Sequence, residues 1–285
     1  FWRAGGIAPD LELKDVLPRF TDEAIQVIKG HVAEHATDPL LLYLALPAPH
    51  TPWLPSPEFD GRSSAGMFGD FVMMVDAMIG RVLATLDESG LAKNTLVCFG
   101  SDNGPVWYDE DVARFGHDSA GPLRGMKADA WEAGHRMPFI ARWPGKIAPG
   151  AVTGQTICFT DMLTTFADIT GAELGPDDGP DSFSILPVLL GTQPDDQPIR
   201  GPVVIPAGGM MSIRKGDWKL ITGLGSGGFS EPRSMKPGPG DPKGQLYNLA
   251  DDLGETKNLY NAHPEIVADL TQELDRIVKD GRTRK

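Results

Sequence analysis

Residues 94–104, NTLVCFGSDNG, join a short apolar run to a polar turn, and this combination indicates the fold class. The run LVCF, residues 96–99, is apolar at consecutive positions, which is typical of a strand buried on both faces of a parallel sheet. Asp102 and Asn103 follow the strand, and Gly104 allows the chain to turn away. Ligands of open α/β sheets bind beyond the carboxyl ends of the strands. The stretch therefore predicts an α/β fold with a functional loop at residues 101–104.

The residues around this stretch alternate between helix and strand patterns. Besides the strand just described, we expect a helix over 22–36 with Thr21 as its N-cap, an apolar strand within 39–46, a helix over 70–88, a strand within 137–145, and a helix over 160–171 that begins at Thr160 and stops at Gly171. The alternation predicts a domain over residues 1–195 with a mostly parallel sheet flanked by helices.

The pattern changes after Pro194. Residues 210–223, MMSIRKGDWKLITG, read as a hairpin with a Lys-Gly-Asp turn, and residues 223–244 are rich in glycine and proline. QLYNL, residues 245–249, predicts a short strand, and an amphipathic helix is expected over Pro264–Lys279. Residues 196–285 are therefore expected to form a small α+β subdomain with antiparallel strands.

Composition limits the partners of the chain. Its 285 residues carry a net charge of -13 at pH 7, which argues against a nucleic-acid partner. An anionic substrate would need a metal ion or a local Lys/His cluster to reverse the field. No apolar run has the length of a membrane span. The two cysteines, Cys98 and Cys158, lie in apolar contexts and are expected to be buried thiols, with one disulfide as the alternative.

Asp102 and Asn103 allow two interpretations. Carboxylate and amide oxygens are ligands that a hard cation such as Ca²⁺ or Mg²⁺ prefers. Asp-Asn-Gly is also an ordinary turn sequence, and two oxygens are fewer than the six to eight or so that Ca²⁺ takes. The residues alone leave both interpretations open.

Further motifs give these residues a context. They are LALPAPHTPW at 44–53, GPLRGMKADAWEAGHRMPFIARWPG at 121–145, TDMLTTFADITGA at 160–172, DSFSILPVLLG at 181–191, RKGDWKLI at 214–221 and LYNLADDLGETKNL at 246–259. In this order, and over nearly the whole chain, they resemble the sulfatases of the alkaline-phosphatase-like superfamily. The resemblance implies the fold of that superfamily and a sulfuric ester hydrolase that acts on a small anionic substrate.

The resemblance also implies roles for single residues. Asp102 and Asn103 match two metal ligands, normally for Ca²⁺, with Mg²⁺ as the alternative. His50 matches the histidine that contacts the sulfate ester and assists the leaving oxygen, and Lys127 matches the lysine that binds the sulfate. General acid catalysis by a protonated histidine and charge stabilisation by lysine and metal suit this reaction.

Two more histidines are substrate-binding candidates. His135 lies in EAGHRMP, which resembles the family's EGGxRxP region, with Ala133 in place of a glycine. His117 lies in FGHDSAGPLRG and is expected to line the substrate pocket. His31, His35 and His263 are assigned no role.

The nucleophile of the family is not found in this sequence. Sulfatases use a formylglycine made from a cysteine, or sometimes a serine, in C-x-[PA]-x-R, and neither Cys98 nor Cys158 lies in that signature. The chain also starts without Met, at Phe1. We therefore expect the C-terminal portion of a longer enzyme, inactive alone, with the formylglycine in the N-terminal part. Missing strands are expected to leave apolar sheet surface uncovered.

Two other functions remain open. One is a phosphoester or phosphonate-ester hydrolase of the same superfamily, and the other is a non-catalytic binding protein on the same fold. Aryl sulfates, sulfated sugars and glycosaminoglycans are all candidate substrates. A periplasmic or secreted location is implied by the resemblance alone, and the oligomeric state stays open.

Overall fold

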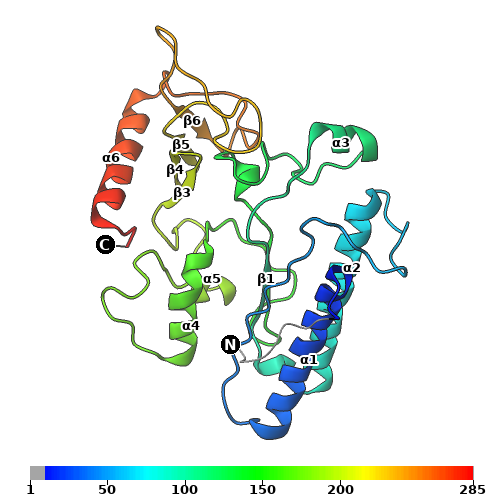
Figure 1. Ribbon diagram of the computed structural model, residues 1–285. Coiled ribbons are helices and arrows are strands. Elements are labelled where there is room, and N and C mark those ends of the chain that lie inside the picture. The colour runs from blue at the N-terminus through cyan, green and yellow to red at the C-terminus, as the bar shows by residue number, and fades with distance from the viewer. Residues whose placement is uncertain (1–9, 285) are drawn as a thin grey trace. The chain divides into compact units, whose positions relative to one another are not determined.

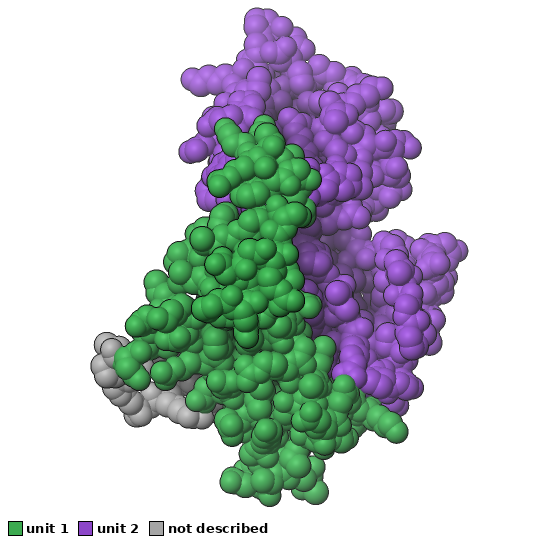
Figure 2. Space-filling model, turned by 90° about the vertical axis from the view of Figure 1, so that its right-hand side faces the viewer, with its two compact units in different colours: residues 1–96, 109–117 green, residues 97–108, 118–285 purple. Residues whose placement is uncertain are grey.

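A computed structural model of the chain describes residues 10–284, which form two compact units. Unit 1 contains the residues up to 96 together with 109–117, and unit 2 contains residues 97–108 and the chain from 118 onwards. Figure 2 shows unit 1 in green and unit 2 in purple. Among the described residues, no helix combines the length and apolar composition needed to cross a membrane.

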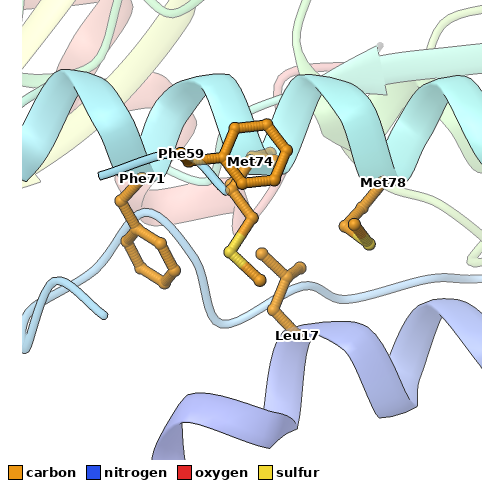
Figure 3. Packing of buried hydrophobic residues seen from close by; sticks show 6 residues of the cluster. Leu17, Phe59, Phe71, Met74 and Met78 are labelled. Carbon is orange, nitrogen blue, oxygen red and sulfur yellow. The ribbon is translucent and has the colours of Figure 1, made fainter. Parts of the chain in front are cut away.

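Unit 1 is helical. A 3-10 turn, Leu13–Asp15, leads into α1 (Val16–Glu34), and α2 (Gly66–Glu88), a 3-10 turn (Ala92–Asn94) and α3 (Asp109–Phe115) follow. Leu17 of α1 points toward Met74 of α2 in a core that includes Phe59, Phe71 and Met78 (Figure 3). This core accounts for the helix predicted over 70–88, whose apolar residues recur on one face.

Helix α1 begins earlier than the sequence pattern predicted. Thr21 lies inside the helix, where its hydroxyl donates to the carbonyl of Leu17, so it is not the N-cap. The reason is tertiary packing: Leu17 is only 2% exposed, and burying it extends the apolar face by a further turn.

The strand predicted within 39–46 is not formed. In the described part of the chain no segment pairs with these residues, and Leu41 and Tyr43 are 74% and 88% exposed. A strand exists only through hydrogen bonds to a neighbour, so an apolar run without one remains an extended segment. These exposed side chains belong to an extended segment and not to a sheet, so the expectation of uncovered sheet surface stays a prediction.

Unit 2 begins with a two-stranded sheet. Strands β1 (Val97–Gly100) and β2 (Phe139–Arg142) are antiparallel, with Val97 opposite Arg142. Both strands were predicted, but within the described residues they pair antiparallel and not parallel, and β1 is mostly exposed and not buried on both faces. The burial of the cysteines was not confirmed either. Cys98 is exposed and Cys158 is half-buried, and both are free thiols.

Helix α4 (Met162–Thr170) follows a 3-10 turn, Phe159–Asp161, and ends at Gly171 in the left-handed conformation, as predicted. The N-cap of α4 is Asp161 rather than Thr160, and the 3-10 turn before it is capped at Cys158, whose backbone N–H donates to the carboxylate of Asp161 at 2.7 Å. Asp161 is fully buried and is paired with Arg200 at 2.8 Å. This pair ties the start of α4 to the segment between the short helix α5 (Leu186–Leu189) and the next strand.

The C-terminal part of unit 2 is a four-stranded antiparallel sheet with one helix. Its strands, in sheet order, are β3 (Val203–Ala207), β4 (Met210–Lys215), β5 (Trp218–Ile221) and β6 (Gln245–Asn248). Helix α6 (Pro264–Asp280) lies along this sheet (Figure 1). Ile213, Leu220 and Leu246 of the sheet pack against Leu270, Leu274 and Ile277 of the helix. The predicted antiparallel subdomain is thus formed, whereas a domain boundary at residue 195 stays a prediction.

Two loops of unit 2 are locked together by their backbones. The N–H of Gly104 donates to the carbonyl of Gly134 at 3.1 Å, and the N–H of Lys127 donates to the carbonyl of Pro105 at 2.7 Å. A Cβ atom at residue 104 would lie 1.6 Å from the carbonyl oxygen of Ala133. Gly104 is therefore required by close backbone contact, not only by the turn.

Replacing Gly104 by alanine should destabilise the chain by roughly 2–4 kcal/mol, because backbone atoms must move to admit the methyl group. Gly154→Ala is the matched control, since nothing lies within 4 Å of a Cβ there. The control should change stability by less than about 0.5 kcal/mol. Urea unfolding of both variants beside the parent chain measures the difference, and equal midpoints would contradict the packing argument.

Candidate functional site

One pocket of unit 2 collects most of the residues singled out in the sequence. It has a volume of about 280 Å³ and is lined by Asp102, Asn103, Lys127, Asp129 and His135, among others. The first two come from the loop after β1, and the others come from the loop between α3 and β2. The two backbone hydrogen bonds between these loops fix the walls of the pocket relative to each other.

The side chains of Asp102 and Asn103 have oxygen atoms that accept no hydrogen bond within the described residues. The amide nitrogen of Asn103 donates to the carbonyl of Gly104 at 2.9 Å, which leaves its Oδ1 without a donor among the described residues. Asp102 is exposed, and no described side chain or backbone group bonds its carboxylate. Adjacent carboxylate and amide oxygens that accept no hydrogen bond are suitable ligands for a hard divalent cation. Within residues 10–284, however, no three acidic, histidine or cysteine side chains gather as a metal site, so these oxygens fit only part of a Ca²⁺ shell.

Lys127 stands on a strained turn. No carboxylate of the described residues pairs with its ammonium group. The next residue, Ala128, has a φ of 72°, in the left-handed region that non-glycine residues rarely adopt. The turn is held in this form from outside, since the backbone of Gly228 packs so closely on Ala128 that a Cβ at 228 would lie 2.4 Å from its carbonyl carbon. Strain of this kind persists where surrounding contacts over-determine the backbone.

Asp129 clamps this turn to the glycine-rich segment. Its side chain is 2% exposed and accepts three backbone N–H groups, from Met126 at 2.8 Å, Phe229 at 2.7 Å and Ser230 at 3.1 Å. Ala130 adds a backbone bond to the carbonyl of Ser226 at 2.7 Å. The start of the glycine- and proline-rich segment is thus an ordered wall behind Lys127.

A buried ion network adjoins the pocket at His135. The ammonium group of Lys219 on β5 contacts Glu132 at 3.0 Å and Glu255 at 2.9 Å, and all three side chains are at most 1% exposed. Glu255 also accepts the backbone N–H of Glu132 at 2.6 Å. Arg214 on β4 pairs with the second oxygen of Glu132 at 3.2 Å. The network joins the C-terminal sheet to the turn Glu132–Gly134, whose carbonyl at 134 holds Gly104.

Burial and charge shift the pKa values of these groups in different directions. Burial raises the pKa of Glu255. Burial acts in the same sense on Glu132, but the charge of Lys219 and the other nearby cations outweighs it, so the pKa of Glu132 lies below its usual value. Burial, together with the charge of Lys219, lowers the pKa of His135 to about 4. At neutral pH the pocket therefore contains a neutral imidazole.

His50 and His117 belong to unit 1. His50 is exposed in the loop between α1 and α2, and its Nδ1 lies 2.8 Å from the carbonyl of Thr51. His117 is exposed at the end of that unit. The structure thus brings Asp102, Asn103, Lys127 and His135 together, and the participation of the other two histidines stays a prediction.

The sequence patterns did not reveal Asp129 or the network of Glu132, Lys219 and Glu255. One signal was present, because WKLI places a lysine in an otherwise apolar strand of a predicted hairpin. A lysine there either faces solvent or is buried with partners, and the pattern alone does not decide between them.

Comparisons with known proteins identify the family of the chain. The sulfatase family model matches residues 18–172. An N-acetylgalactosamine-6-O-sulfatase from Bacteroides thetaiotaomicron is 34% identical over 97% of the chain and 53% of its own length. Human arylsulfatase A is 32% identical over 87% of the chain and 52% of its own length. The chain spans about half the length of these curated relatives.

Solved structures show the same relationship. A Bacteroides thetaiotaomicron structure, described under the metabolism of multiple glycosaminoglycans, is 32% identical and has a TM-score of 0.79 over 94% of the chain and 55% of its own length. A sulfatase from Pseudoalteromonas sp. is 25% identical, with a TM-score of 0.78 over 96% of the chain and 55% of its own length. The resemblance of the motifs and the expected fold class are both confirmed: the chain belongs to the sulfatase family of the alkaline-phosphatase-like superfamily.

Proposed function

We propose that the protein that contains this chain hydrolyses sulfate esters, and that the pocket of unit 2 binds the sulfate group. The observation that carries the proposal is that one pocket brings together side-chain oxygens of Asp102 and Asn103 that accept no bond within residues 10–284 and the ammonium group of Lys127, which has no carboxylate partner there. An ammonium group held on a rigid turn stabilises charge on the nonbridging sulfate oxygens without reorganising during the reaction.

The other roles follow from the family. Asp102 and Asn103 are proposed to supply two ligands of a Ca²⁺ ion, which would add positive charge next to the sulfate. His50 is proposed to contact the ester oxygen and to give it a proton as it leaves. Sulfatases generally depend on calcium and on a formylglycine nucleophile, and the latter is proposed to come from a part of the protein outside this sequence.

A sulfated sugar is the proposed substrate class. The relative that aligns with 97% of this chain is named for the 6-O-sulfate of N-acetylgalactosamine, whereas the arylsulfatase A match is slightly less complete. No contact in the pocket favours a phosphate ester over a sulfate ester. An exported location suits a polysaccharide substrate and remains part of the proposal.

Lys127→Ala should lower kcat/KM of the complete gene product at least about 100-fold on a sulfated N-acetylgalactosamine, because a charge-assisted contact to the sulfate is lost. It should also weaken competitive inhibition by inorganic sulfate. Lys146→Ala is the matched control, since Lys146 is an exposed lysine of the same unit outside the pocket. Equal activity of the two variants would refute the role of Lys127.

The 285-residue chain alone should show no turnover of 4-nitrophenyl sulfate, because no cysteine or serine of its sequence lies in the signature that forms the nucleophile. The assay is run beside the complete gene product at equal molar concentration with added Ca²⁺. Turnover by the chain that disappears in Lys127→Ala would show that the nucleophile lies within these residues.

A further inference from the structure

His135 connects the pocket to the buried network. It lines the pocket with Lys127, and its Nε2 lies 3.2 Å from the ammonium group of Lys219. The same nitrogen lies 3.3 Å from the carbonyl of Ala130. A ring nitrogen without a proton accepts a bond, and one with a proton donates. The two neighbours therefore require opposite tautomers of the ring.

Lys219 decides between the tautomers. An ammonium group has three protons and no lone pair, so it only donates. Among the described residues the ammonium group of Lys219 has two hydrogen-bond partners, Glu132 and Nε2 of His135, and Glu255 lies 2.9 Å away as an ion pair without hydrogen-bond geometry. If Nε2 carried a proton for Ala130, one proton of a fully buried cation would face another N–H and lack an acceptor. A buried N–H of a charged group that makes no hydrogen bond costs free energy. We therefore infer that Nε2 accepts a hydrogen bond from Lys219 and that the ring proton is on Nδ1.

The Nδ1 atom of His135 is the accessible end of the ring. It has no hydrogen-bond partner among the described residues. It is also not among the buried side-chain atoms without a partner, so it is in contact with solvent. The side chain is 16% exposed. An accessible N–H on a residue of the pocket wall is available to a ligand, and its partner must be a hydrogen-bond acceptor.

We propose that His135 contacts the substrate by donating from Nδ1–H to an oxygen of the sugar that carries the sulfate, and that Lys219 is the positioning residue that fixes this tautomer. The inference rests on the proposed function, because it assigns the second polar contact of the same pocket. The low pKa of His135 supports it, since a neutral imidazole adds a directed donor without adding charge. Such a donor suits a hydroxyl or carbonyl oxygen, whereas the ammonium group of Lys127 suits the sulfate.

The tautomer is tested first, on the complete gene product labelled with ¹⁵N-histidine. Two-bond ¹⁵N–¹H correlation at pH 7, with His135→Gln to assign the signal, reports which ring nitrogen is protonated. We expect the proton on Nδ1. A proton on Nε2, or on both nitrogens, would overturn the inference without reference to any activity.

The contact is tested with two amide variants. The amide of His135→Gln reaches the position of Nε2, where its oxygen can accept from Lys219, but no donor remains at Nδ1. His135→Asn places its amide nitrogen near the position of Nδ1 and restores a donor there. We expect the first variant to raise KM for the sulfated sugar about 10-fold with little change in kcat, and the second to recover part of that loss.

Inorganic sulfate separates this inference from the proposed function. As a competitive inhibitor it has no sugar oxygens, so its inhibition constant should be unchanged in His135→Gln and raised in Lys127→Ala. If Lys127→Ala has its effect while His135→Gln leaves KM unchanged, the inference fails and the proposed function stands. If Lys127→Ala changes neither activity nor sulfate inhibition, the proposed function fails first.

Discussion

The ammonium group of Lys219 is buried together with the carboxylates of Glu132 and Glu255, and the site depends on this interaction. Moving an ammonium ion out of water has a penalty of several kcal/mol even after the protein relaxes. The penalty is offset only where partners surround the group in good geometry, and here Glu132 and His135 are hydrogen-bond partners while the carboxylate of Glu255 adds a second counter-charge at 2.9 Å. The arrangement fixes geometry more than it adds stability, because a well-packed apolar replacement of such a group is often no less stable.

As a consequence, a series of contacts connects the C-terminal sheet to the pocket. Lys219 on β5 fixes Glu132, the first residue of a short turn, and the last residue of that turn is Gly134. The carbonyl of Gly134 accepts the N–H of Gly104, which follows the two proposed metal ligands. Asp129 performs a similar task for the turn that carries Lys127, through three backbone N–H groups. Contacts with the C-terminal subdomain, through the side chain of Lys219 and the backbone N–H groups of Phe229 and Ser230, thus set the shape of loops that lie far away in the sequence.

Local patterns predicted the elements whose stability is local, and they did not predict what depends on distant partners. The helix over 70–88 and the hairpin turn after Lys215 follow from periodicity and turn residues, and both are present. The apolar run at 39–46 is no strand, because strand formation depends on a neighbour that periodicity does not supply. Cys98 looked buried for the same reason, since its context fixed the strand but not what covers it. At the site, motif resemblance found Asp102, Asn103 and Lys127. Glu132 and Glu255 acquire their roles only through contacts with Lys219, which is 87 positions after Glu132 in the sequence.

Charge explains why anion binding and cation binding belong together in this pocket. Its wall holds one ammonium group, on Lys127, against the carboxylates of Asp102 and Asp129, and His135 is neutral. The whole chain is also acidic, so a sulfate approaching these residues alone meets a net negative field. Asp129 is partly compensated by three N–H groups, but Asp102 is not, and a divalent cation on Asp102 and Asn103 would reverse the sign locally. The same residues that look unfavourable for an anion therefore favour it once a cation is bound, and the substrate and the ion should strengthen each other's binding.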